Sequence, residues 1–176
     1  MTGPETRKGE SPKAMMQTAL NKEIFCTRVI ENQEALFRTA KAILRNDEDA
    51  EDAVQEAICA AFERRQTLRD ADKFRPWILR ILANKCYDAC RKRRPSVDLS
   101  EVEECLRAPE ADPTERMTLW QAVMTLGDDL RAPVTLFYYD GLSIREISGV
   151  LGISEAAVKT RLSRGRARLR VLLREE

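Results

Sequence analysis

The chain has 176 residues, of which 43% are hydrophobic and 34% charged, and its 30 Lys and Arg are nearly balanced by 29 Asp and Glu, for a formal net charge of +1. This length allows one domain or two small ones, and the high charge with few glycines and prolines favours an all-α soluble protein. The net charge excludes a polycation, so any affinity for nucleic acid must come from basic residues gathered on one surface.

The composition also excludes several kinds of active site. There is no histidine, and the five cysteines form no CxxC pair, which excludes Cys/His zinc sites. Cys86 and Cys90 share a helical face and would either respond to oxidants or, as we favour, be small buried thiols in a reducing cytosol. The chain has no nucleophile motif and no phosphate-binding glycine loop, so we expect no enzyme activity, cofactor, metal or small-molecule substrate.

The apolar residues are not grouped in a way that suits a membrane. No apolar run is long enough to cross a bilayer, and the first residues, MTGPETRKGESPK, lack the apolar core of a signal peptide. We therefore expect a cytoplasmic protein with no membrane insertion.

The N-terminal part predicts a disordered tail followed by a helix. Residues 1–20 are polar and aperiodic. A helical pattern then runs from Asn21 to Arg45 and should end near Asn46. Its apolar positions are Ile24, Val29, Leu36, Ala40, Ile43 and Leu44.

A second helix is predicted to begin with a cluster of acids. Carboxylates are favoured in a first helical turn by the helix dipole, and here they are Asp47, Glu48, Asp49, Glu51 and Asp52. A divalent metal site is the alternative, but such sites need convergent oxygen ligands, whereas these acids fan out around the helix. The inner face is Ala50, Ala53, Val54, Ala57, Ala61 and Phe62.

A polar segment, 64–73, leads into a third, basic helix. Pro76 suits a first helical turn, so the helix should run from Trp77 to the basic cluster 91–94. Cations beside exposed aromatics form a surface that suits single-stranded nucleic acid. The alternative is that Phe74 and Trp77 are simply core residues.

The next segment, 96–114, is acidic, contains Pro109 and Pro113, and has no lasting period, which predicts an extended linker. Two further helices are expected over Glu115–Leu126 and Leu130–Tyr139, the second with Pro133 near its beginning. Asp140 and Gly141 then make a turn.

Residues 142–170 predict a helix-turn-helix. Ser143 and Glu146 have the spacing of a capping box, which starts a helix at Ile144. Gly152 suits the turn, and Ser154 offers the next N-cap. The second helix has a buried stripe through Val158, Leu162, Leu169 and Leu172 or Leu173.

The opposite face of this second helix is polar and basic, as in a recognition helix that enters the major groove. The residues pointing away from the apolar stripe are Ala156, Lys159, Thr160, Ser163 and Arg164, and those flanking it are Arg161, Arg166, Arg168 and Arg170. The alternative is an ordinary solvated amphipathic helix.

Three motifs in this order resemble regions 2 and 4 of the extracytoplasmic-function sigma factors of bacterial RNA polymerase. They are DAEDAVQEAICAAF at 49–62, FRPWILRILANKCYDACRKRR at 74–94 and DGLSIREISGVLGISEAAVKTRLSRGRARLR at 140–170. The resemblance implies two small helical domains, region 2 over 21–95 and region 4 over 115–176, joined by a flexible acidic linker. It implies binding to core RNA polymerase and promoter DNA, with recognition and melting of the promoter.

The resemblance also assigns residues in region 2. The contact with the polymerase clamp would be made by Asp49, Asp52, Gln55 and Glu56. The loop that captures a flipped base of the −10 element, with its neighbours, would comprise Leu68, Arg69, Asp72, Lys73, Phe74, Trp77, Asn84 and Arg91. Extracting a base costs a few kcal/mol of stacking, which a preformed pocket beside a cationic helix can offset.

In region 4 the resemblance places the −35 element on the second helix of the helix-turn-helix. Base edges would be read by Lys159, Thr160, Ser163 and Arg164. Phosphates would be held by Ser154, Arg161, Arg166 and Arg168.

Three positions depart from the family pattern. Ser148 stands where alanine is usual, so its hydroxyl needs a partner such as a carbonyl one turn back. Pro133 interrupts a helix that is usually continuous and suggests a late start, and Gly127 stands where proline is common.

Two other functions compete with that of a sigma factor. An operator-binding regulator would explain the helix-turn-helix but would leave residues 49–94 without a role. An adaptor that mimics a sigma factor would not need Lys159, Thr160 and Arg164 exposed together. Since the binding surfaces of a sigma factor expose apolar and basic area, we also expect an anti-sigma factor that masks them.

Overall fold

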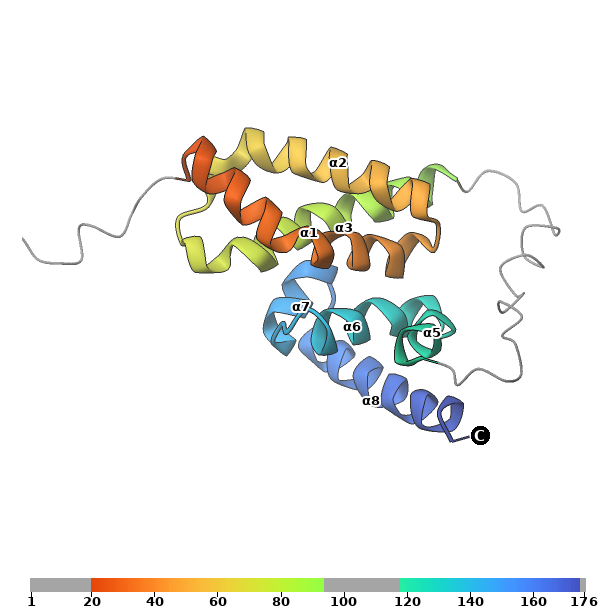
Figure 1. The fold of residues 1–176 in the computed structure, drawn as a ribbon. Coiled ribbons are helices and arrows are strands. Elements are labelled where there is room, and N and C mark those ends of the chain that lie inside the picture. Colours follow the sequence, from red (N-terminus) through yellow and green to blue (C-terminus); the bar gives the residue numbers. More distant parts are fainter. Residues whose placement is uncertain (1–19, 94–117, 175–176) are drawn as a thin grey trace, which may run out of the picture.

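The computed structural model describes residues 20–93 and 118–174, and these residues are helical without strands. They form two helical bodies, shown one above the other in Figure 1. The N-terminal body (20–93) contains α1, α2 and α3, and the C-terminal body (118–174) contains α5, α6, α7 and α8. The predicted tail, apart from buried Leu20, and the predicted linker lie outside the described residues.

The N-terminal body is a bundle of three helices: α1 (Lys22–Leu44), α2 (Asp47–Arg64) and α3 (Phe74–Lys92). Asparagine caps the first two, since the Asn21 side chain accepts from the Ile24 amide (2.8 Å) and Asn46 from the Asp49 amide (3.1 Å). The predicted inner face of α2 is confirmed at its alanines, which are buried: Ala50, Ala53, Ala57 and Ala61. Small residues there allow α2 to pack closely on α1 and α3.

The third helix begins three residues earlier than predicted, at Phe74. Pro76 still lies in the first turn, where its missing N–H removes no helical hydrogen bond. Two short 3-10 helices, η2 (Arg65–Thr67) and η3 (Ala71–Lys73), connect α2 to α3. The polar segment therefore has local structure that its aperiodic sequence did not predict.

In the C-terminal body the helices are α5 (Leu119–Met124), α6 (Asp128–Tyr138), α7 (Ile144–Leu151) and α8 (Glu155–Leu172). The prediction that α5 begins at Glu115 is wrong in part, because Thr118 caps it in a capping box with Gln121, and residues 115–117 lie outside the described part. The late start predicted for α6 is also wrong. The helix begins at Asp128, before Pro133, with Asp128 and Asp129 in its first turn.

The predicted helix-turn-helix is confirmed in its local details. The Glu146 amide donates to the Ser143 hydroxyl (3.2 Å), and the Ser143 amide donates to the Glu146 carboxylate (2.9 Å). Gly152 ends α7 at φ 66°, and Ser154 caps α8. Ser148 differs from expectation, because its hydroxyl donates forward across the turn to the Ile153 carbonyl (2.6 Å) and so ties the two helices together.

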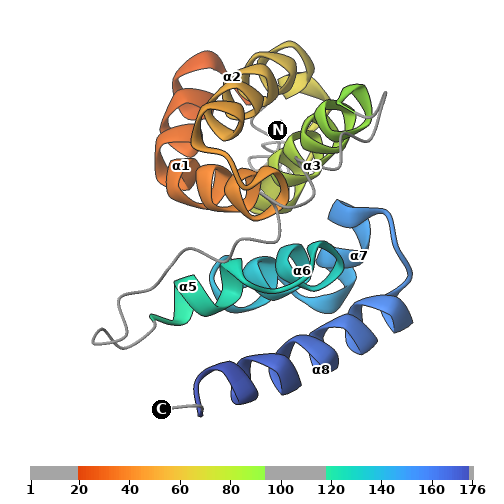
Figure 2. The ribbon, with the colours of Figure 1, turned by 90° about the vertical axis from the view of Figure 1, so that its right-hand side faces the viewer.

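The two bodies contact each other along a surface that we call the seam, where α1 packs on α6 and α3 on α7. Figure 2 shows α6 and α7 facing the N-terminal body, with α8 on the far side. Helix α8 is therefore directed away from the seam.

Candidate polymerase and promoter surfaces

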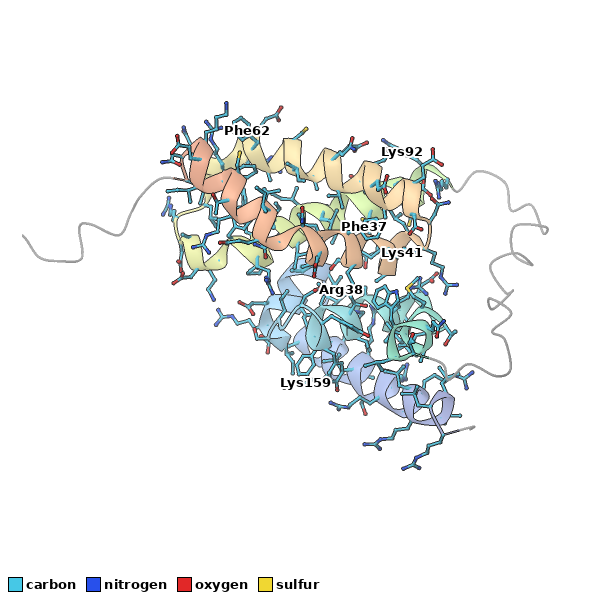
Figure 3. All side chains as sticks on the ribbon, viewed as in Figure 1. Phe37, Arg38, Lys41, Phe62, Lys92 and Lys159 are labelled. Carbon is cyan, nitrogen blue, oxygen red and sulfur yellow. The ribbon has the colours of Figure 1, made fainter. Side chains whose placement is uncertain are left out.

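The outer side of α8 is an exposed basic face. Val158, Leu162 and Leu169 are buried against the rest of the C-terminal body. Gly165 is buried as well, and a Cβ built there would lie 2.5 Å from Val134 Cγ2, so α8 approaches α6 closely at this point. Seven of the residues predicted to contact the −35 element are exposed: Ser154, Lys159, Thr160, Ser163, Arg164, Arg166 and Arg168. Figure 3 labels Lys159, which lies on the C-terminal body away from the seam.

Several of these polar groups already have partners within the protein. The Ser154 hydroxyl accepts from the Ala157 amide (3.1 Å), and the Thr160 hydroxyl donates to the Ala156 carbonyl (3.0 Å). Such a bond leaves the oxygen lone pairs and the methyl group of Thr160 available to a ligand. Arg166 donates to the Tyr138 hydroxyl at 3.4 Å.

Arg161 differs from the other predicted phosphate contacts. Its side chain is half-buried and lies near Tyr87 of α3. Burial raises the pKa of the Tyr87 phenol, and the positive charge of Arg161 opposes that rise. The structure therefore does not bring Arg161 onto the exposed face with Lys159 and Arg164.

The residues predicted to bind the −10 element lie before and along α3, with Leu68 to Trp77 around its start, Asn84 in its middle and Arg91 in its last turn. Exposed members are Arg69, Asp72, Lys73, Asn84 and Arg91, while Leu68 and Trp77 are half-buried. Phe74 does not fit the prediction that it contacts the −10 strand. Its side chain is only 2% exposed and packs edge-on against Phe25, with 5.9 Å between the ring centroids. In this arrangement Phe74 belongs to the core and cannot stack on a base.

Helix α7 lies across part of this −10 surface. Lys73 Nζ is 3.4 Å from Glu146 Oε1, so the capping residue of α7 also pairs with a predicted DNA contact. A cleft of about 580 Å³ opens between the bodies here, and Lys73, Trp77 and Arg80 line it opposite Arg145 and Glu146. The hydrogen bond from the Ser143 amide is the main reason why the pKa of Glu146 lies below its ordinary value.

The predicted polymerase contacts lie on α2. Asp52, Gln55 and Glu56 are exposed. Asp49 is 19% exposed and forms an ion pair with Arg93, and Glu56 pairs with Lys85 at 3.8 Å. The exposed acids of α2 thus form a surface that can meet a basic partner.

Sequence reasoning did not find the polar contacts of the seam. Asp140, whose side chain is 0% exposed, accepts from Arg38 Nη1 (2.7 Å) and Thr39 Oγ1 (2.9 Å), both on α1. Its backbone carbonyl accepts from Arg75 Nη1 (3.1 Å), and Arg75 Nε donates to Asn32 (2.7 Å). We call this set of five residues the Asp140 latch. The DG turn marked the position of Asp140 but not its partners.

The sequence also offered a redox-active cysteine pair and a metal site as alternatives. Cys86 is buried, and this burial raises the pKa of its thiol to about 12, so it is not a reactive thiolate at neutral pH. Among the described residues, no group of three or more Cys, Asp or Glu could hold a metal ion. None of the described helices is long and apolar enough to cross a membrane.

Comparison with known proteins identifies both bodies. Residues 29–95 match Sigma-70 region 2, and residues 116–169 match Sigma-70, region 4. The ECF RNA polymerase sigma factor SigM of Mycobacterium tuberculosis is 35% identical over 144 residues, which cover 78% of this chain and 71% of SigM.

Solved structures agree in fold. The sigma factor RpoE of Bartonella quintana, in complex with the anti-sigma factor NepR, superposes with a TM-score of 0.66 at 23% identity, covering 85% of this chain and 96% of RpoE. CnrH, in complex with the cytosolic domain of CnrY, gives 0.62 at 29% identity, covering 89% and 91% of the two chains. The chain belongs to the extracytoplasmic-function RNA polymerase sigma factors of the sigma-70 family.

Proposed function

We propose that this sigma factor binds core RNA polymerase, brings it to promoters by contacts with the −35 and −10 elements, and catalyses nothing itself. The observation that carries the proposal is the exposed face of α8, which presents Lys159, Thr160, Ser163 and Arg164 on the side away from the seam. These side chains suit the edges of bases in a major groove.

On the −35 element, the residues of α8 would divide into two groups. Lys159 and Arg164 suit guanine O6 and N7, and Thr160 suits a thymine methyl group. Arg166 and Arg168, with Ser154 at the helix start, suit phosphates, where they set the position of the helix without reading sequence. Arg161 joins the phosphate contacts only if the C-terminal body moves away from Tyr87.

On the −10 element, the segment before α3 and the outer side of α3 would hold the single strand, with the exposed cations Arg69, Lys73 and Arg91 neutralising phosphates. The candidates are Leu68, Arg69, Asp72, Lys73, Trp77, Asn84 and Arg91. Trp77 is half-buried and offers the aromatic surface that Phe74 does not.

Polymerase would dock on the exposed acids of α2, chiefly Asp52 and Glu56 with Gln55 between them, and on Asp49 at the edge. Carboxylates on one helix face can be steered to a basic partner surface over a distance of about 8 Å, the screening length at physiological salt.

We also propose an anti-sigma factor as a partner, since the similar RpoE was solved with one. The exposed apolar side chains of the free chain, such as Ile30 at 65% and Leu119 at 49%, offer area that such an inhibitor can cover. We place the protein in the cytoplasm, where core polymerase acts.

The direct test is transcription with purified core polymerase on a library of genomic fragments. The chain should start transcripts at a defined set of fragments. Asp52→Lys should reduce both association with core and transcript yield at least tenfold, whereas Glu63→Lys, at the other end of the same helix, should reduce neither. Specific nanomolar binding of the same fragments without polymerase would identify an operator-binding regulator instead.

A further inference from the structure

Three hydrogen bonds join Ser148, near the end of α7, to the turn before α8. The Ser148 carbonyl accepts from the amides of Gly152 (3.0 Å) and Ile153 (3.3 Å), as is common at helix ends. The Ser148 hydroxyl donates to the Ile153 carbonyl (2.6 Å). Ser148 is half-buried, so water competes little for this bond. One residue therefore holds both peptide planes that flank Ile153.

The hydroxyl bond differs from the other two because it acts on the start of α8. The hydrogen bonds of α8 begin at the Ser154 carbonyl, which accepts from the Val158 amide (3.0 Å). The Ile153 carbonyl precedes them and lies outside the helix. Ser154 is the N-cap, and its hydroxyl accepts from the Ala157 amide (3.1 Å). The peptide that Ser148 holds is therefore the one that leads into the first turn of α8.

The second half of α8 is fixed in another way, by close packing. Gly165 is buried against α6, where a built Cβ would lie 2.5 Å from Val134 Cγ2, and Leu169 is buried one turn further on. Val158 and Leu162 also pack the first half of the helix. Apolar packing is not directional, however, so it allows small rotations that a hydrogen bond restrains. The first half of α8 thus depends on the turn for its exact direction.

We infer that Ser148 is a positioning residue for promoter reading: its hydroxyl holds the first half of α8 at the angle at which Lys159 and Thr160 reach base edges. This inference rests on the proposed function. With a rise of 1.5 Å per residue, a rotation of roughly 5° about Gly165 would move Lys159 and Thr160 by roughly 0.7 Å but Arg164 by only about 0.1 Å. A hydrogen bond keeps its strength only within about 0.5 Å of length. Loss of the Ser148 hydroxyl should therefore affect the base pairs read near the turn.

The test compares Ser148→Ala with a matched control, each as the full chain bound to core polymerase. The control is Thr125→Ala. The Thr125 hydroxyl also belongs to a half-buried residue at a helix end and donates to a carbonyl, that of Ala122 (2.8 Å), but it lies at the end of α5. Promoters that differ at single −35 base pairs compete for each complex. The base pairs read by Lys159 and Arg164 are located first, as those at which Lys159→Ala and Arg164→Ala lose discrimination.

The expected loss is graded along α8. Ser148→Ala should lose discrimination on the order of threefold to tenfold at the base pair located with Lys159→Ala, and less than about twofold at the one located with Arg164→Ala. Thr125→Ala should lose discrimination at neither. Equal losses at both base pairs, which a general destabilisation would cause, or no loss at the first would overturn the inference.

Hydrogen exchange of the free chain gives a second measurement that does not depend on DNA. In Ser148→Ala the Ala157 amide should exchange several-fold faster than in the wild type, whereas the Leu169 amide should be unchanged. Unchanged exchange at Ala157 would also overturn the inference. If the wild type ignores the −35 sequence while Ala157 still responds to Ser148→Ala, the proposed function is what fails, because Ser148 still places α8.

Discussion

Arginine has two different roles, one at the seam between the two bodies and one on the outer face of α8. At the seam, Arg131 is fully buried and Arg38 is about a quarter exposed, and both donate to named oxygens on the opposite body. On α8, Arg164 and Arg168 are exposed to solvent. Buried arginines fix the arrangement of the protein, whereas exposed ones are available to DNA, so the same substitution should have opposite consequences in the two places.

The largest expected effect is at the seam. Arg131→Ala should lower the free energy of unfolding by about 3 kcal/mol, because it leaves a cavity where a large side chain was fully buried and deprives the Ala42 and Leu126 carbonyls of this donor. Arg164→Ala should change the same quantity by no more than about 0.5 kcal/mol. Urea denaturation followed by circular dichroism measures both, and equal losses would contradict the distinction.

On DNA the order of the effects should reverse. Arg164→Ala should weaken discrimination at one −35 base pair by about 1–3 kcal/mol, since a bidentate contact to guanine is lost. Arg168→Ala should weaken binding about equally on all sequences. The measurement is competition between single-base promoter variants for the polymerase complex. Uniform weakening by Arg164→Ala would show that Arg164 contacts DNA phosphates and does not read a base.

The inner side of α8 gives a smaller effect on stability. Gly165→Ala should cost roughly 1–2 kcal/mol, because the new Cβ meets Val134 Cγ2 at 2.5 Å and overpacking exceeds the gain in helix propensity. Gly149→Ala in α7 is the matched control: a Cβ there meets nothing within 4 Å, so a gain of about 0.5–1 kcal/mol is expected. Thermal denaturation of the two variants should shift the midpoint in opposite directions, and a shift in the same direction would contradict the close packing of α8 on α6.

The smallest effect is expected at the solvent-exposed edge of the seam. Lys73→Gln removes the pair with Glu146, but Lys73 is 61% exposed, so opening should become easier by about 0.5 kcal/mol or less. The pKa of Glu146 is lower in the folded chain than in the unfolded chain. Its contribution to folding stability is therefore complete above the pKa of an unfolded glutamate and is lost as the pH falls through the lower pKa of the folded state. The difference between wild type and variant should therefore vanish in 1 M salt or in acid, as small-angle X-ray scattering can show.

Local sequence signals predicted the helices and their ends well. The Ser143–Glu146 capping box, the Gly152 turn and the Ser154 cap depend on residues within a few positions of one another, and all three are confirmed. The errors at α5 and α6 are also local, since caps and first-turn acids outweighed the expectations drawn from periodicity and Pro133.

The contacts of the seam could not be predicted in the same way. Arg38 and Asp140 are 102 positions apart, and neither has a sequence pattern that names the other. Phe74 shows a related difficulty, because an aromatic beside a basic loop looks the same in sequence whether it faces solvent or packs on Phe25. Such pairings follow from how the helices are packed, which periodicity alone does not determine.

The most direct measurement is a chemical footprint of promoter DNA bound to core polymerase and this chain. We expect protection at the −35 element and, in the same complexes, unpaired reactive bases at the −10 element, with neither signal when polymerase or the chain is omitted. Protection at one patch without melting, or the same footprint in the absence of polymerase, would contradict the assignment of α8 and the N-terminal body to two parts of one promoter.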